Sequence, residues 1–122
     1  MPVIPPTVLK KLYVKGSLRS EDAGFAFDLK NLIAPATITN VKGLDVDGES
    51  TTGSLVTLVP PSGNARPADR ISSGRPLEFP VGGVVTLHVV AEPLDVGQHD
   101  LALHIDVKEI GSLDIPISDN IN

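Results

Sequence analysis

The sequence of 122 residues contains no cysteine and no tryptophan, and it has only one tyrosine and three phenylalanines. Without cysteine, a disulfide framework, a thiolate nucleophile and a Cys-ligated zinc or iron–sulfur site are all excluded. The net charge of −5 and the scarcity of aromatic rings leave neither the positive surface nor the stacking platforms that nucleic-acid binding requires. We therefore expect no nucleic-acid partner.

Basic leader segments and long apolar runs are also missing. The first residues, MPVIPP, carry no positive charge, and no apolar stretch approaches the ~18 residues of a membrane span. The sequence therefore predicts no signal peptide, no membrane association and a cytoplasmic location. Its length is that of one domain, which we place over residues 1–122.

Glycine and proline are abundant, at 11 residues each, and they are dispersed along the chain. Between them, apolar residues recur at every second position, which is typical of half-buried strands. The predicted strands are residues 8–15, 24–31, 36–47, 54–59, 84–91, 98–109 and 112–118. This pattern predicts an all-β fold, a single antiparallel β-sandwich or jelly-roll-like domain.

Turn residues add local detail to this prediction. Gly43 indicates a bulge or bend, the pair Asp47 and Gly48 indicates a tight hairpin, and Pro116 indicates an edge strand. A short helix over residues 29–33 is the alternative that the spacing of their apolar side chains leaves open.

The longest irregular stretch is residues 60–76, which holds Arg66, Arg70 and Arg75 against one acidic residue, Asp69. Loops of this length are often functional or mobile. Guanidinium groups are favoured at protein interfaces, so this loop either docks on an acidic or polar partner or is a solvated surface loop.

Histidines and paired carboxylates are the remaining candidates for chemistry. His104 and Asp106 share the polar face of one predicted strand, where a metal site or an acid–base pair is conceivable. His99 lies five residues from His104, so the two do not converge as cupin ligands would, and His88 lies on another strand. Acid pairs such as Glu21 with Asp22, or Asp45 with Asp47, are expected in turns or on solvated faces. We predict no catalytic residue and no metal ligand in this chain.

Two stretches nevertheless resemble a known family. The run FDLKNLIAPATITNV at residues 27–41 with VDG at 46–48 looks like the N-terminal signature of C-glycoside deglycosidase β subunits. The runs PLDVGQH at 93–99, GSLDI at 111–115 and DNI at 119–121 are similar to the ending of that family.

The resemblance implies a small β-sandwich subunit that assembles with a larger TIM-barrel-like α subunit into a hetero-oligomer. That complex is a lyase, which cleaves the C–C bond between a 3-oxo-glucosyl group and an aromatic aglycone such as a flavonoid. The resemblance places the acid–base residues and a divalent metal, usually manganese, in the α subunit, and no cofactor in this chain.

A partner subunit would cover apolar residues that alternation leaves outside, for which the candidates are Ala26, Ile33, Val84 and Val90. The segments predicted to face the partner are the arginine loop and the bend at residues 32–36. The resulting set of partner-facing residues is Arg66, Arg70, Arg75, Ile33 and Pro35. Two alternatives are a free-standing β-sandwich that binds carbohydrate or protein, and a cupin-like metalloenzyme.

Overall fold

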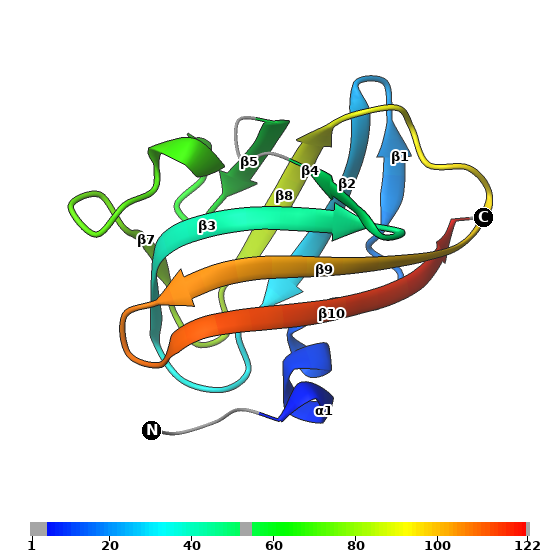
Figure 1. The fold of residues 1–122 in the computed structure, drawn as a ribbon. Helices are drawn as coiled ribbons and strands as arrows, with labels where there is room; N and C mark the ends of the chain where they lie inside the picture. The colour runs from blue at the N-terminus through cyan, green and yellow to red at the C-terminus, as the bar shows by residue number, and fades with distance from the viewer. Residues whose placement is uncertain (1–4, 52–54, 122) are drawn as a thin grey trace.

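Alternating apolar residues build two antiparallel sheets that pack face to face (Figure 1). The structure is a computed structural model that describes residues 5–51 and 55–121. Sheet A has the strand order β1-β2-β8-β5-β6, and sheet B has the order β10-β9-β3-β4, with β7 added beside β3. The strands are β1 (Arg19–Glu21), β2 (Gly24–Lys30), β3 (Ala36–Val46), β4 (Glu49–Thr51), β5 (Val56–Val59), β6 (Arg66–Pro67), β7 (Leu77–Phe79), β8 (Val84–Val90), β9 (Gly97–Val107) and β10 (Gly111–Ile121). The predicted all-β sandwich is confirmed.

The core lies between the two sheets and is filled by one face of each long strand. The largest fully buried side chains are Phe25, Phe27, Leu29, Leu44, Leu58, Leu77, Leu87, Leu103, Ile115, Val56 and Val85. Burying one such side chain contributes about 1.5–3 kcal/mol, so the alternating pattern fixes which face of each strand turns inward. The other faces carry the polar residues outward.

The predicted turns and edges are also confirmed. Asp47 and Gly48 both have positive φ, 50° and 89°, and join β3 to β4 in the tight turn that this residue pair favours. The register of β3 against β9 shifts between Val41 and Gly43, which is the predicted bulge. Pro116 lies in β10 at the edge of sheet B, and the ladder with β9 runs through it without a register shift.

The strand predicted over residues 8–15 is wrong for most of its length. The chain instead forms helix α1 (Pro6–Leu9) and the 3₁₀ helix η1 (Lys10–Leu12), which lie below β10 in Figure 1. Proline fits the first turn of a helix, and the three-residue spacing of Leu9 and Leu12 brings both into the core, each 5% exposed. Only at Tyr13, which bridges to Leu29, does the segment pair with a strand.

Two other expectations are corrected or limited. No helix forms over residues 29–33, because β2 continues to Lys30 and a bend follows. The strand predicted over residues 54–59 corresponds to β5 (Val56–Val59). Its predicted first residue, Ser54, lies outside the described residues. None of the helices in the described ranges has the length or the apolar content to cross a membrane.

Gly24 offers a test of how closely sheet A is packed. Its φ is +155°, and a Cβ built there would lie 1.9 Å from the Val89 carbonyl oxygen and 2.8 Å from the Ala91 nitrogen. We expect Gly24→Ala to lower the free energy of unfolding by about 2 kcal/mol or more, because both close atoms are backbone. Denaturant unfolding followed by circular dichroism measures this. Gly74→Ala is the matched control, since its nearest neighbour would be the Ser72 Oγ at 3.9 Å, and equal losses in the two variants would refute the packing argument.

Candidate functional site

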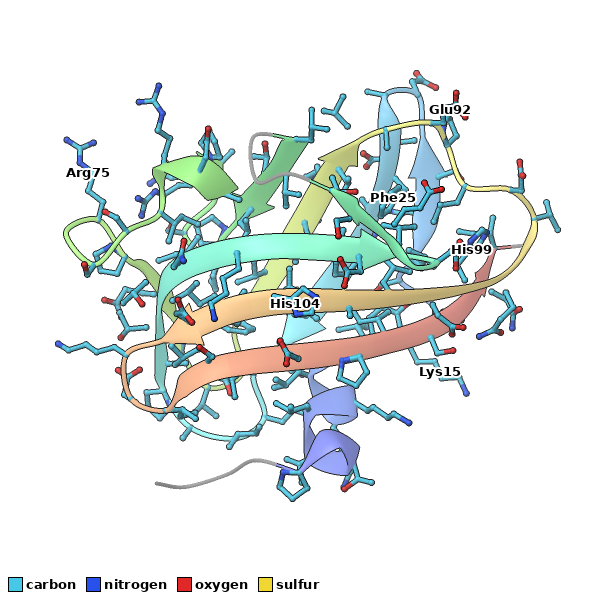
Figure 2. All side chains as sticks on the ribbon, viewed as in Figure 1. Lys15, Phe25, Arg75, Glu92, His99 and His104 are labelled. Atoms are coloured by element: carbon cyan, nitrogen blue, oxygen red, sulfur yellow. The ribbon has the colours of Figure 1, made fainter. Side chains whose placement is uncertain are left out.

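The outer face of sheet B carries a row of hydrogen-bonded polar side chains centred on His104. Its Nδ1 lies 2.6 Å from an Asp114 carboxylate oxygen on β10, and its Nε2 lies 2.8 Å from an Asp45 oxygen on β3. Figure 2 shows His104 on the front of the sheet, on the middle strand of these three. His104 therefore links three neighbouring strands on a face open to solvent.

The ring of His104 needs two protons to make both contacts, because carboxylate oxygens only accept hydrogen bonds. The contact with Asp114, and then the contact with Asp45, raise the pKa of His104 above its ordinary value. The His104 contact, followed by the Ser50 hydroxyl, lowers the pKa of Asp45. The arrangement stabilises an imidazolium between two carboxylates rather than a neutral base.

The same arrangement does not suit a metal ion. The two carboxylates lie on opposite sides of the ring, and Asp106, the predicted companion of His104, instead accepts hydrogen bonds from Ser112 and Asn40. Among residues 5–51 and 55–121, no group of three or more His, Cys, Asp or Glu side chains is placed to hold a metal ion.

His99 and His88 also pair with carboxylates. His99 Nδ1 lies 2.7 Å from Asp47 Oδ2, at the β3–β4 turn, and His88 Nδ1 lies 3.0 Å from Glu21 Oε2, at the end of β1. All three histidines therefore lie on the outer faces or the rim of the sandwich, as the strand phases predict.

The arginine loop is more ordered than its sequence suggests. Within residues 60–76 the chain forms β6 and the 3₁₀ helix η3 (Ala68–Arg70), and Ile71 enters the core. Arg66 donates hydrogen bonds to the carbonyl oxygens of Pro76, Arg75 and Arg70 at 2.7, 2.7 and 3.3 Å. Its guanidinium thus binds its own loop, while Arg70 and Arg75 are exposed, and Figure 2 shows Arg75 pointing away from the domain. A partner-facing role of the three arginines stays a prediction.

The other predicted segment, residues 32–36, is built around Asn31, a residue that the sequence reasoning missed. Asn31 is 3% exposed, and its amide nitrogen donates to the carbonyl oxygens of Ala34 and Phe79 at 2.6 and 2.7 Å. Its side-chain oxygen accepts from the Ile33 N–H. Its backbone bonds to Gly82 and Gly83 at 2.7 and 3.1 Å. One buried amide thus fixes two loops against each other.

These two loops, and the first residue of β8 after the second of them, hold large apolar side chains in solvent. Leu32 and Val81 are 57% and 54% exposed, and Ile33 and Val84 are 40% and 39% exposed. Pro35, between them and β3, is exposed as well. We call Leu32, Ile33, Val81 and Val84 the apolar end; both of its loops lie at the lower side of the view in Figure 1.

Of the other predicted apolar candidates, Val90 is exposed but lies at the opposite end of β8 from Val84. The expectation that a partner covers Ala26 is wrong, because Ala26 has no exposed surface, although it belongs to the outward face of β2. Its cross-strand neighbours are Arg19 and His88, whose long side chains cover a small one.

The fold and these surfaces define a β-sandwich domain whose ordered polar groups lie on open faces rather than in an enclosed pocket. A family model described as hydroxymethylglutaryl-CoA reductase, N-terminal domain, matches residues 8–122, so the chain belongs to this family. No curated protein matches the chain.

This family overturns the resemblance to C-glycoside deglycosidase β subunits. The stretches that carried it are strand and turn residues of β2, β3, β9 and β10 and the loops beside them, which a sandwich of another family also contains. A lyase acting on 3-oxo-glucosyl flavonoids is therefore wrong, and the alternative of a free-standing binding module has no support. The family is named for a reductase, so the chain belongs with an enzyme of a different class.

Asn31 is expected to be the most sensitive polar side chain of the domain. Asn31→Ala leaves the Phe79 carbonyl oxygen without its partner in a buried contact, which costs about 1–3 kcal/mol. It also removes two part-buried contacts, with the Ala34 carbonyl and the Ile33 N–H. We expect a loss of at least about 2 kcal/mol in the free energy of unfolding, measured with denaturant. Asn40→Ala is the control, since Asn40 is exposed and makes one long contact of 3.3 Å; a similar loss there would contradict the assignment.

The histidine pairs predict how stability varies with pH. Because the folded-state pKa values of His104 and His99 are raised, their contribution is complete below about pH 6.5 and is lost as the pH rises through those raised values. Asp45 and Asp47 have lowered pKa values, so their contribution is present above about pH 4 and is lost as the pH falls through those lowered values. We expect maximal stability between these limits.

His104→Gln should reduce the decline in stability above pH 6.5, because the variant has no imidazolium to lose there. Denaturant unfolding at a series of pH values from 4 to 9 measures it. His88→Gln is the control, since His88 faces one carboxylate through one ring nitrogen. A decline of unchanged size in His104→Gln would show that the pairing with Asp45 and Asp114 adds nothing to stability.

Proposed function

We propose that this chain is a non-catalytic domain of a hydroxymethylglutaryl-CoA reductase, and that it associates with the catalytic region of that enzyme. The catalytic region either continues the same polypeptide or is a separate, larger chain. The observation that carries the proposal is the apolar end, together with the family to which the chain belongs.

The apolar end supports association because its side chains are apolar, exposed and held in place. Exposed apolar side chains that stand alone are ordinary, but a contiguous group of them favours a protein interface. Of the seven exposed large hydrophobic side chains in the described residues, three lie in the two loops that Asn31 joins and a fourth, Val84, begins β8 directly after the second loop. Loops that are already ordered lose little conformational entropy when a partner binds.

The polar groups of the domain favour a non-catalytic role. His104 is held as an imidazolium between two carboxylates on an open face. Both of its ring nitrogens are occupied by these carboxylates, whereas general acid–base catalysis needs a group that is free to exchange a proton with the reacting atom. We propose that the chemistry and any cofactor belong to the larger partner. The TIM-barrel-like α subunit and its divalent metal were implied only by the deglycosidase resemblance and are not carried over to this partner, while the cytoplasmic location remains a prediction.

A binding experiment with surface variants tests the association. The double variant Leu32→Ser with Val81→Ser should raise the dissociation constant of the complex with the catalytic region by tenfold or more. Both side chains are more than half exposed in this chain, and the serines no longer offer the partner apolar surface to bury. The dissociation constant, measured by calorimetry, gives the magnitude.

The matched control is Val96→Ser, which removes an even more exposed valine, at 79%, from the loop between β8 and β9. It should bind like the wild type. Equal weakening in both variants, or no binding of the wild type, contradicts the proposed surface. Reduction of hydroxymethylglutaryl-CoA by the isolated chain would refute the non-catalytic role.

A further inference from the structure

His99 stands where two segments of the chain meet. The β3–β4 turn and the segment 91–96, which joins β8 to β9, border a groove of about 520 Å³. Figure 2 shows His99 at this corner of the molecule, with Glu92 above it on the joining segment. The lining residues used below are Asp47, Glu49, Glu92, Leu94, Asp95 and His99. The side chain of His99 is 12% exposed, whereas that of its partner Asp47 is 46% exposed, so the pair lies at the edge of the groove.

Both nitrogens of this ring face hydrogen-bond acceptors. Nδ1 lies 2.7 Å from Asp47 Oδ2, and Nε2 lies 2.7 Å from the backbone carbonyl oxygen of Asp95. A neutral imidazole carries one N–H and one lone pair, so it can donate to only one of the two. The second contact then places two lone pairs against each other at hydrogen-bond distance. The observed geometry therefore requires the doubly protonated ring.

When the ring loses one proton, the proton leaves Nε2, the nitrogen that contacts the Asp95 carbonyl. A carboxylate accepts a stronger hydrogen bond than a neutral carbonyl does, so the remaining proton stays on Nδ1. Asp47 is also fixed in place, since its Oδ1 accepts from the Asp100 N–H at 2.9 Å and its own N–H donates to the Asp100 carbonyl at 2.7 Å.

The segment 91–96 has other anchors, but they hold its first part. Ala91 donates to the Ala23 carbonyl at 3.1 Å, and the Ser20 hydroxyl donates to the Leu94 carbonyl at 2.9 Å. Leu94 itself packs against the core. Beyond Leu94, the chain is held through the Asp95 carbonyl by His99, and Val96 is 79% exposed. Loss of one contact can therefore free Asp95 and Val96 without unfolding the sheet.

We propose that His99 is a proton-dependent latch. The doubly protonated ring holds segment 91–96 against the β3–β4 turn, and removal of the proton on Nε2 releases the Asp95 end of the segment beside the groove. This is a conformational device of the domain itself, beyond its association with a catalytic region.

Each element that packs beside His99 carries an acidic residue near the ring. Asp47 faces it from the turn, Asp95 from the joining segment, and Asp119 is its cross-strand neighbour on β10. The Asp119 carboxylate accepts from Tyr13 and from the Gly16 N–H, and Glu49 and Glu92 line the same groove. The contact with Asp47, followed by the Asp95 carbonyl, raises the pKa of His99. Release is thus expected above the ordinary histidine value of about 6.5.

Nuclear magnetic resonance of the whole chain tests the latch. Between pH 5 and 9, the ring nitrogens of His99 should change from the doubly protonated form to the tautomer with its proton on Nδ1. With the same midpoint, the backbone order parameters of Asp95 and Val96 should fall from about 0.85 to below about 0.6. Order parameters that stay constant while the ring titrates overturn the proposal. A neutral ring protonated on Nε2 overturns it too, because Asp95 would then stay bound.

Two variants separate the latch from a general effect of pH. His99→Gln should keep the order parameters of residues 95 and 96 independent of pH. His104→Gln should keep the wild-type midpoint, because His104 contacts Asp45 and Asp114 and not the joining segment. The same pH-dependent loosening in His99→Gln as in the wild type refutes the role of His99.

Discussion

The two-residue repeat of the strands decides on which face of a sheet each strand residue lies, and with it where the charges on the strands gather. In β9 the core takes Leu101, Leu103, Ile105 and Val107, all at most 4% exposed, and the residues between them must face outward. The strands beside it, β3 and β10, obey the same rule. Carboxylates from three strands and one histidine therefore share one outer face at cross-strand distance, where opposite charges stabilise each other. The pairing of His104 with Asp45 and Asp114 is a direct result of packing on the other side of the sheet.

Much of the fold could be predicted because its signals are local. The alternation around Leu103, the turn at Asp47 and Gly48, and the edge position of Pro116 each depend on a few neighbouring residues. Leu9 and Leu12 misled the prediction because a short segment with apolar residues at both spacings fits a strand or a helix, and packing against the core decided for the helix. The order inside residues 60–76 was missed because it depends on Arg66 reaching carbonyls up to ten residues away.

The candidate sites were harder to predict, for a physical reason. Which side chains meet across a sheet depends on the register between strands far apart in the sequence, such as Asp45 and His104, which lie 59 residues apart. Asn31 shows the same limit, since its partner Phe79 is 48 residues away. The similarity to deglycosidase subunits failed because it was carried by strand and turn residues, which report the architecture of a sandwich rather than the enzyme with which it works. The family match covers residues 8–122 as a whole and therefore reports on the domain rather than on a few of its turns.

Pro116 has a consequence for the behaviour of this domain before it meets a partner. Strand β10 is eleven residues long and forms the open edge of sheet B, and such an edge is a template for pairing with strands of other molecules. Proline offers no N–H to an incoming strand, and helices α1 and η1 pack beside the same strand. Both features make the long edge of sheet B a poor template for pairing with another strand.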